Sequence, residues 1–186
     1  VGIGNELLGD EGLGVHVARL LLASKAELPP GVEVLEAGTA LFDVVSEMAR
    51  YPWVILVDAI RRGGAPGAIY RAELEGELEG GCEPSPPLSL HQGGPFETLA
   101  RAKLLGLLPE RLTLLGAEPE RIALSTELSP TLRRAAAHLV SVLLAEIQAG
   151  EARHARPEVF CSCRRAGLAV WHSVCFLVRG LESVCA

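Results

Sequence analysis

The sequence predicts an α/β fold, a three-layer sandwich in which a mostly parallel, twisted sheet of about five strands lies between helices. Short apolar runs bounded by glycine and proline alternate with segments whose apolar residues recur at helical spacing, which is typical of parallel α/β domains. The run Trp53-Val54-Ile55-Leu56-Val57 is apolar throughout, as expected of a strand buried on both faces of a sheet. Ser129-Pro130 places a good N-cap before a proline and predicts the start of a long helix.

The predicted elements alternate in order along the chain. The first helix has Leu20, Leu21 and Leu22 available for its apolar face, and the acidic segment 75–87, rich in glycine and proline, predicts a surface loop. Strands are predicted at residues 1–4, 32–36, 53–57, 67–74 and 111–116. Helices are predicted at residues 12–26, 41–50, 96–105 and 130–148.

Composition limits the classes of partner. A net charge of −6 argues against a surface that neutralises nucleic-acid phosphates. The most apolar stretch, residues 166–178, is shorter than the roughly 20 residues that cross a bilayer, so we expect no membrane insertion. The odd total of five cysteines speaks against a disulfide framework and favours a reducing, cytoplasmic compartment. Because the sequence opens with Val-Gly-Ile-Gly-Asn, we expect the first strand to lack N-terminal residues.

A change in composition divides the chain near Gly150. Residues 1–150 carry an excess of acidic side chains, whereas residues 151–186 carry an excess of basic ones and hold most of the cysteines. We therefore predict one domain over residues 1–150. Residues 151–186 form a tail of unknown role, for which a disordered extension, an interaction segment and a non-native end remain open.

The glycine-rich turn at residues 2–14 resembles a dinucleotide-binding loop only in part. Glycines after a strand and before a helix can bring the backbone close to a pyrophosphate. Here Glu6, Asp10 and Glu11 would face such an anion with like charge, so the turn favours a cation. In the alternative interpretation, Asp10 and Glu11 complement the dipole of the following helix.

Three ionisable side chains are predicted at one edge of the sheet. Glu11 follows the first strand, Asp58 ends the apolar run 53–57, and His91 follows the long loop. Loops after parallel strands share one edge, where ligands bind, and two carboxylates with one imidazole suit zinc, nickel or iron. The alternatives are that Asp58 caps a helix or pairs with a nearby arginine, and that His91 binds backbone.

Five segments in order resemble the hydrogenase maturation peptidase family. They are Gly-Ile-Gly-Asn-Glu-Leu-Leu-Gly-Asp-Glu-Gly-Leu-Gly at 2–14, Glu-Ala-Gly-Thr-Ala at 36–40, Ile-Leu-Val-Asp-Ala-Ile at 55–60, Ser-Leu-His-Gln at 89–92 and Leu-Leu-Gly-Ala-Glu-Pro at 114–119. The resemblance implies a phosphorylase-like architecture and a monomeric cytoplasmic endopeptidase that removes the C-terminal extension of a nickel-loaded [NiFe] hydrogenase large-subunit precursor. It implies that Glu11, Asp58 and His91 are catalytic and interact with nickel supplied by the substrate, and that Glu36 lies in a loop beside the cleft. Relatives often have aspartate at that position, and the tail after residue 150 resembles no feature of the family.

Two routes of hydrolysis remain open at this point. The metal could polarise the scissile carbonyl or acidify a water, or Glu11 and Asp58 could act as an acid/base pair while the metal only licenses binding. Neither a Gly-x-Ser-x-Gly elbow nor a His-Glu-x-x-His helix is present in the sequence. The rival functions are a nickel-binding hydrogenase chaperone that cuts nothing and a nucleoside phosphorylase-like enzyme.

Overall fold

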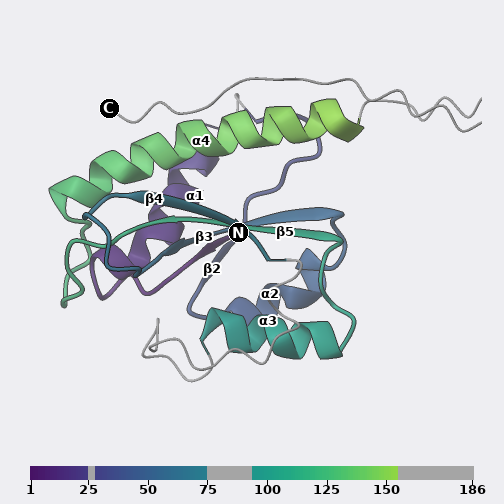
Figure 1. The fold of residues 1–186 in the computed structure, drawn as a ribbon, viewed down its shortest axis with the longest axis horizontal. Coiled ribbons are helices and arrows are strands. Elements are labelled where there is room, and N and C mark those ends of the chain that lie inside the picture. The colour runs from purple at the N-terminus through teal and green to yellow at the C-terminus, as the bar shows by residue number, and fades with distance from the viewer. Residues whose placement is uncertain (25–27, 75–93, 155–186) are drawn as a thin grey trace, which may run out of the picture. The chain divides into compact units, whose positions relative to one another are not determined.

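A five-stranded sheet with the order β2-β1-β3-β5-β4 forms the middle layer of the protein (Figure 1). The structure is a computed structural model that describes residues 1–24, 28–74 and 94–154. Neighbouring strands pair in parallel except β4, which runs antiparallel to β5. The predicted α/β class and mostly parallel sheet are therefore confirmed. The strands are β1 (Gly2–Ile3), β2 (Glu36–Gly38), β3 (Trp53–Ala59), β4 (Ile69–Glu73) and β5 (Arg111–Ala117).

Helices cover both faces of the sheet, as a three-layer sandwich requires. One face carries α1 (Leu13–Ala23) and α4 (Pro130–His154), and the other carries α2 (Leu41–Met48) and α3 (Pro95–Leu104) (Figure 1). A short 3-10 turn, η1 (Asp10–Gly12), precedes α1. The predicted cap of α4 is confirmed, because the backbone N–H of Leu132 donates to Ser129 Oγ at 3.2 Å. None of the helices in the described part of the chain is long and apolar enough to span a membrane.

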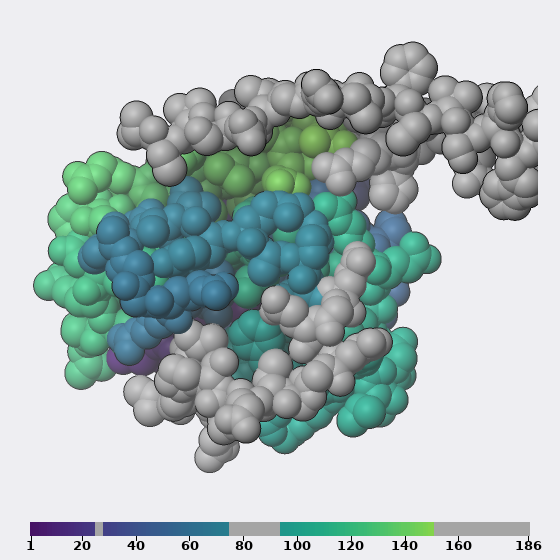
Figure 2. All heavy atoms as spheres, in the orientation of Figure 1, coloured from purple at the N-terminus to yellow at the C-terminus, as the bar shows by residue number. Residues whose placement is uncertain are grey.

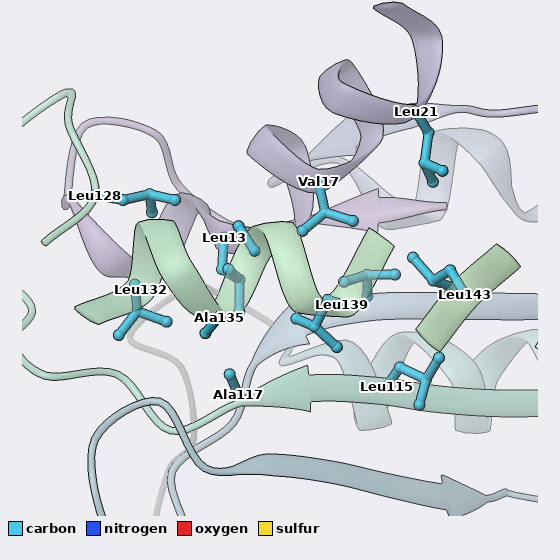
Figure 3. Close-up of a cluster of buried hydrophobic side chains, with 12 residues drawn as sticks. Leu13, Val17, Leu21, Leu115, Ala117, Leu128, Leu132, Ala135, Leu139 and Leu143 are labelled. Carbon is cyan, nitrogen blue, oxygen red and sulfur yellow. The ribbon is translucent and has the colours of Figure 1, made fainter. Parts of the chain in front are cut away.

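Each face of the sheet has its own apolar core. Leu13, Val17 and Leu21 of α1 pack with α4, β3 and β5 on one side (Figure 3). On the other side α2 and α3 pack against β1 and β3 through residues that include Met48 and Leu99. A Cβ atom at Gly14 would lie 2.0 Å from the carbonyl oxygen of Val57. Glycine at this position therefore allows α1 to lie directly on the sheet.

Several element boundaries differ from the prediction. The second strand is β2 at Glu36–Gly38 rather than residues 32–36, because pairing with the short β1 begins only where Gly2 meets Glu36. Leu20, predicted on the apolar face of the first helix, is exposed, whereas Val17 and Leu21 are buried. The last helix continues to His154, beyond the predicted end at residue 148. The predicted loop 75–87 lies outside the described residues.

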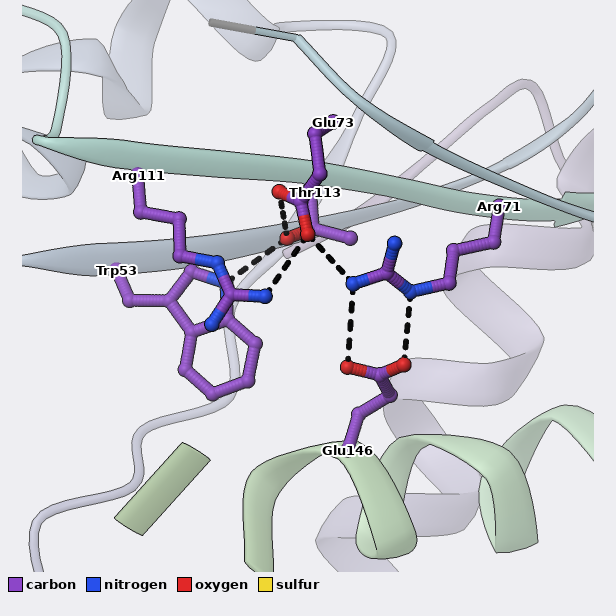
Figure 4. A network of polar contacts seen from close by, with 6 residues as sticks. All are labelled: Trp53, Arg71, Glu73, Arg111, Thr113 and Glu146. Atoms are coloured by element: carbon purple, nitrogen blue, oxygen red, sulfur yellow. Dashed lines mark hydrogen bonds and ion pairs between the residues drawn. The ribbon is translucent and has the colours of Figure 1, made fainter. Parts of the chain in front are cut away.

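The edge strand β4 is held by a polar network at its C-terminal end (Figure 4). Burial alone would raise the pKa of Glu73, but hydrogen bonds from Arg111, Thr113 and Arg71 together lower it to about 2. Arg71 also donates from Nε to Glu146 of α4 at 2.7 Å, and the Arg111 guanidinium lies 4.2 Å from the centre of the Trp53 ring. The network thus joins β4 to β5 and α4, and Figure 2 shows β4 with the loop before it in blue, beneath green α4.

An apolar cavity of about 280 Å³ lies next to Val1, at the end of the sheet where β3 begins. Although β1 is an inner strand, it has two residues, whereas the neighbouring β3 has seven. The Val1 ammonium donates to the Ile55 carbonyl at 2.8 Å, and burial lowers its pKa to about 5. Residues 30–35, residues 53–55 of β3 and side chains of α1 and α4 line the cavity. The cavity therefore lies ahead of β1, between residues 30–35 and the start of β3.

Joining four β-branched apolar residues that fill this cavity of about 280 Å³ ahead of Val1 is expected to raise Tm by about 15–25 °C relative to a Gly-Ser-Gly-Ser extension. Filling a cavity recovers about 24 cal/mol per Å³, and each kcal/mol shifts Tm by about 2–4 °C in a chain of this size. The extension would also move the amine out of the buried position. Calorimetry of the two extended proteins measures the difference. Equal Tm values would show that the cavity does not accept a strand.

Candidate functional site

Four carboxylates gather at the edge of the sheet where the parallel strands end. Asp10 and Glu11 come from the turn after β1, Asp58 is the next-to-last residue of β3, and Glu118 directly follows β5. Asp10, Glu11 and Glu118 are among the few buried charged residues of the described chain. A buried carboxylate is costly unless it is hydrogen-bonded or bound to a cation. Asp10 and Glu118 hold neighbouring loops through hydrogen bonds, whereas Glu11 and Asp58 lie next to each other.

Asp10 anchors the turn after β1 to the loop before α4. Its Oδ2 accepts hydrogen bonds from the backbone N–H groups of Glu120 and Arg121, both at 3.0 Å, and its Oδ1 accepts one from Ser129 at 2.7 Å. The side chain is 1% exposed. Asp10 is therefore a structural anchor, a role that the sequence did not reveal because its partners lie more than a hundred residues away.

Glu118 organises the loop between β3 and β4 in the same way. It accepts hydrogen bonds from the backbone N–H groups of Arg62, Gly63 and Gly64 and from the Tyr70 hydroxyl at 2.8 Å. These bonds lower the pKa of Glu118 despite its burial, which acts in the opposite direction. Glu118 was also missed as a site residue. An acid directly after the apolar run of β5 was the available signal, the same signal that singled out Asp58.

Glu11 and Asp58 are brought together, as predicted from their positions after β1 and on β3. The pKa of Asp58 is raised to about 7, chiefly by burial and also by the nearby charge of Glu11, against a 2.8 Å hydrogen bond from the Ala59 N–H to Oδ1 that lowers it. Gly4 lets the backbone at Glu11 lie against the residue that follows β1. Its φ is 128°, and a Cβ atom there would lie 1.9 Å from the Glu11 carbonyl oxygen.

Asp58 neither caps a helix nor pairs with a nearby arginine of the described residues, the two alternatives that its sequence position left open. It lies inside β3, paired with Gly116 of β5, rather than at the start of a helix. Among the described residues no ion pair joins it to Arg61 or Arg62, which are exposed. Two adjacent carboxylates that repel one another are suited to a cation that neutralises both, or to sharing a proton. The pair can therefore bind a metal ion or exchange a proton near neutral pH.

His91 lies outside the described residues, within the segment 75–93. Within the described ranges no group of three or more His, Cys, Asp or Glu side chains is placed to hold a metal ion. The expected trio is thus represented by Glu11 and Asp58. Glu36 belongs to strand β2 rather than to a loop, where it accepts a hydrogen bond from Arg19 Nε at 2.9 Å.

The chain is similar to proteins of one known family. The model of the hydrogenase maturation protease family matches residues 15–146. The chain is 35% identical over 135 residues to the hydrogenase 2 maturation protease of Escherichia coli strain K12, covering 71% of this chain and 79% of the relative. It is 30% identical over 146 residues to the hydrogenase expression/formation protein HupD of Rhodobacter capsulatus, covering 78% and 67%.

Solved structures show the same fold. The hydrogenase maturating endopeptidase HybD of E. coli superposes with a TM-score of 0.63 at 28% identity, covering 80% of this chain and 90% of that one. The [NiFe] hydrogenase maturation protease HycI of Thermococcus kodakarensis KOD1 also has a TM-score of 0.63, at 27% identity, covering 79% and 89%. The chain therefore belongs to the hydrogenase maturation protease family and is an endopeptidase, a hydrolase of peptide bonds.

Proposed function

We propose that this endopeptidase removes the C-terminal extension of a nickel-loaded [NiFe] hydrogenase large-subunit precursor. The observation that carries the proposal is the pair of Glu11 and Asp58 at the carboxyl edge of the sheet, where burial and mutual charge raise the pKa of Asp58 to about 7. The names of the relatives support it, since one is a maturation protease of a [NiFe] hydrogenase. Residues 1–150 supply the peptidase domain in this proposal, and residues 151–186 are a tail without an assigned role.

In the proposed mechanism nickel belongs to the substrate. Glu11, Asp58 and His91 would bind it, since two carboxylates and an imidazole suit a divalent transition metal. Asp58 would lose its proton on meeting the cation, which offsets the repulsion from Glu11. Hydrolysis then requires water to attack the scissile carbonyl, its proton to pass to a base, and the released amine to gain a proton. A carboxylate that titrates near neutral pH can both accept and return that proton.

The test is incubation of nickel-loaded and nickel-free precursor with the protein, followed by measurement of the precursor mass. Shortening of the nickel-loaded precursor alone is expected. Glu11→Gln, Asp58→Asn and His91→Gln preserve size and are each expected to slow cleavage at least about a hundredfold, the range that loss of an acid/base group or ligand produces. Glu110→Gln, an exposed acid outside the site, is the matched control and should cleave normally.

The other results of this experiment also have definite meanings. Normal cleavage by all three variants would overturn the site assignment. Tight binding of the precursor without any shortening by the wild-type protein would favour a chaperone.

We further propose that the enzyme acts as a cytoplasmic monomer. Sedimentation with and without precursor tests the monomer, and fractionation of cells tests the compartment.

A further inference from the structure

Two loops at the candidate catalytic edge are paired through their backbones, and each carries an exposed leucine. Leu7 is 62% exposed in the loop after β1, and Leu124 is 87% exposed in the loop between β5 and α4. Single exposed leucines are ordinary on protein surfaces. These two differ because they come from distant parts of the chain and are placed together by the backbone.

Backbone pairing fixes the two loops against each other. Leu8 forms a parallel bridge with Ser125, the Ser125 N–H donates to the Leu7 carbonyl at 3.0 Å, and the Gly9 N–H donates to the Ser125 carbonyl at 2.7 Å. Leu7 and Leu124 each precede a bridged residue, so the backbone holds the two leucines at neighbouring positions.

The two paired loops that carry Leu7 and Leu124, here called the platform, continue into the candidate site. Leu7 belongs to the loop that holds Glu11, and Asp10 in that loop binds the backbone N–H groups of Glu120 and Arg121, shortly before Leu124. The platform is thus held at both ends by hydrogen bonds. Ordering an apolar surface before a partner arrives lowers the entropy lost on binding.

Charge near Leu7 is partly offset within the protein. The carboxylate of the neighbouring Glu6 receives two hydrogen bonds from the Arg19 guanidinium, which also binds Glu36. One positive charge facing two carboxylates leaves this surface acidic. The surface beside Leu7 therefore suits an apolar partner better than an acidic one.

We propose that Leu7 and Leu124 form a docking surface for an apolar segment of the protein substrate, outside the bond that is cut. The proposal rests on the proposed function, because it takes the substrate to be the hydrogenase precursor. The two leucines lie on the same edge of the sheet as the candidate site. A protein that presents a peptide bond to Glu11 and Asp58 must lie across this edge, where it meets Leu7 and Leu124.

The test compares Leu7→Asp and Leu124→Asp with Leu104→Asp. Leu104 is a matched control, since it is 88% exposed and ends α3. On the full-length nickel-loaded precursor, Leu7→Asp and Leu124→Asp are each expected to raise KM about tenfold, which corresponds to about 1.4 kcal/mol, with kcat unchanged. Leu104→Asp should match wild type in both constants, and all three variants should keep the wild-type Tm.

Two further measurements separate the possible failures. The Kd of the precursor is measured by titration without following cleavage, so that a docking surface can be found even if the wild-type protein cuts nothing. A Leu124→Met variant should restore wild-type KM, because it keeps the apolar side chain. If Leu124→Asp and Leu104→Asp give the same KM and Kd, the docking surface is ruled out. A change in sedimentation of the free enzyme by Leu124→Asp alone would likewise overturn the proposal in favour of a second copy.

Discussion

Asp58→Asn is expected to stabilise the fold at pH 8 by about 2–4 kcal/mol while removing endopeptidase activity. The pKa of Asp58 rises from 3.8 to about 7 on folding, chiefly through burial and secondarily through Glu11. A carboxyl group with a raised pKa binds its proton more tightly in the folded state. Stability is therefore fully present below about pH 4 and falls as pH rises to about 7. Asparagine carries no charge to bury, and its Oδ1 can still accept the hydrogen bond from the Ala59 N–H.

Urea unfolding at pH 5 and pH 8 measures this effect. Wild type should lose stability between the two pH values by more than Asp58→Asn does, and Asp43→Asn, an exposed residue in the first turn of α2, serves as the control. Glu11→Gln should recover part of the loss, because it removes the charge that opposes ionisation of Asp58. If Asp58→Asn and wild type change in parallel with pH, Asp58 is not the group that titrates.

The positions of Glu11 and Asp58 relative to the strands were enough to predict that they lie at one edge, but not which hydrogen bonds surround them. A buried parallel strand that ends in an acid, and a turn with acids after the first strand, place Asp58 and Glu11 at one edge whatever the details of packing. Sequence spacing could not separate Asp58 from Glu118, since each acid comes at the end of an apolar run. Their roles differ because three backbone N–H groups of residues 62–64 surround Glu118, whereas Asp58 receives one from Ala59.

The second strand shows why pairing limits prediction from sequence. Residues 32–36 have the composition of a strand, yet only Glu36 among them belongs to β2. Whether they pair depends on a neighbouring strand: Glu36 pairs with Gly2 of β1, whereas residues 32–35 line the cavity. Local propensity could not supply this information, because it describes one segment at a time. The role of His91 stays a prediction, which the His91→Gln variant tests.

Asp10 is expected to be among the most sensitive positions of the protein, although nothing is proposed to bind it. Asp10→Ala leaves the N–H groups of Glu120, Arg121 and Ser129 without their acceptor. The Ser129 bond is buried and the other two are partly buried, and a buried N–H that loses its partner costs about 1–3 kcal/mol. We expect unfolding free energy to fall by about 3–5 kcal/mol in total. Asp10→Asn should not rescue it, because the amide nitrogen would turn a donor toward at least one of these N–H groups.

The consequences of losing Asp10 should extend from stability to the site. Ser129 both donates to Asp10 and caps α4 through Leu132, so hydrogen exchange should quicken at the start of α4. Ser129→Ala is the control, since it removes the cap alone and should cost about 1 kcal/mol. At a temperature where Asp10→Asn remains folded, kcat should fall, because the same turn positions Glu11. Wild-type kcat in that folded variant would mean that Asp10 stabilises the fold without positioning Glu11, and that the two functions of the turn are separable.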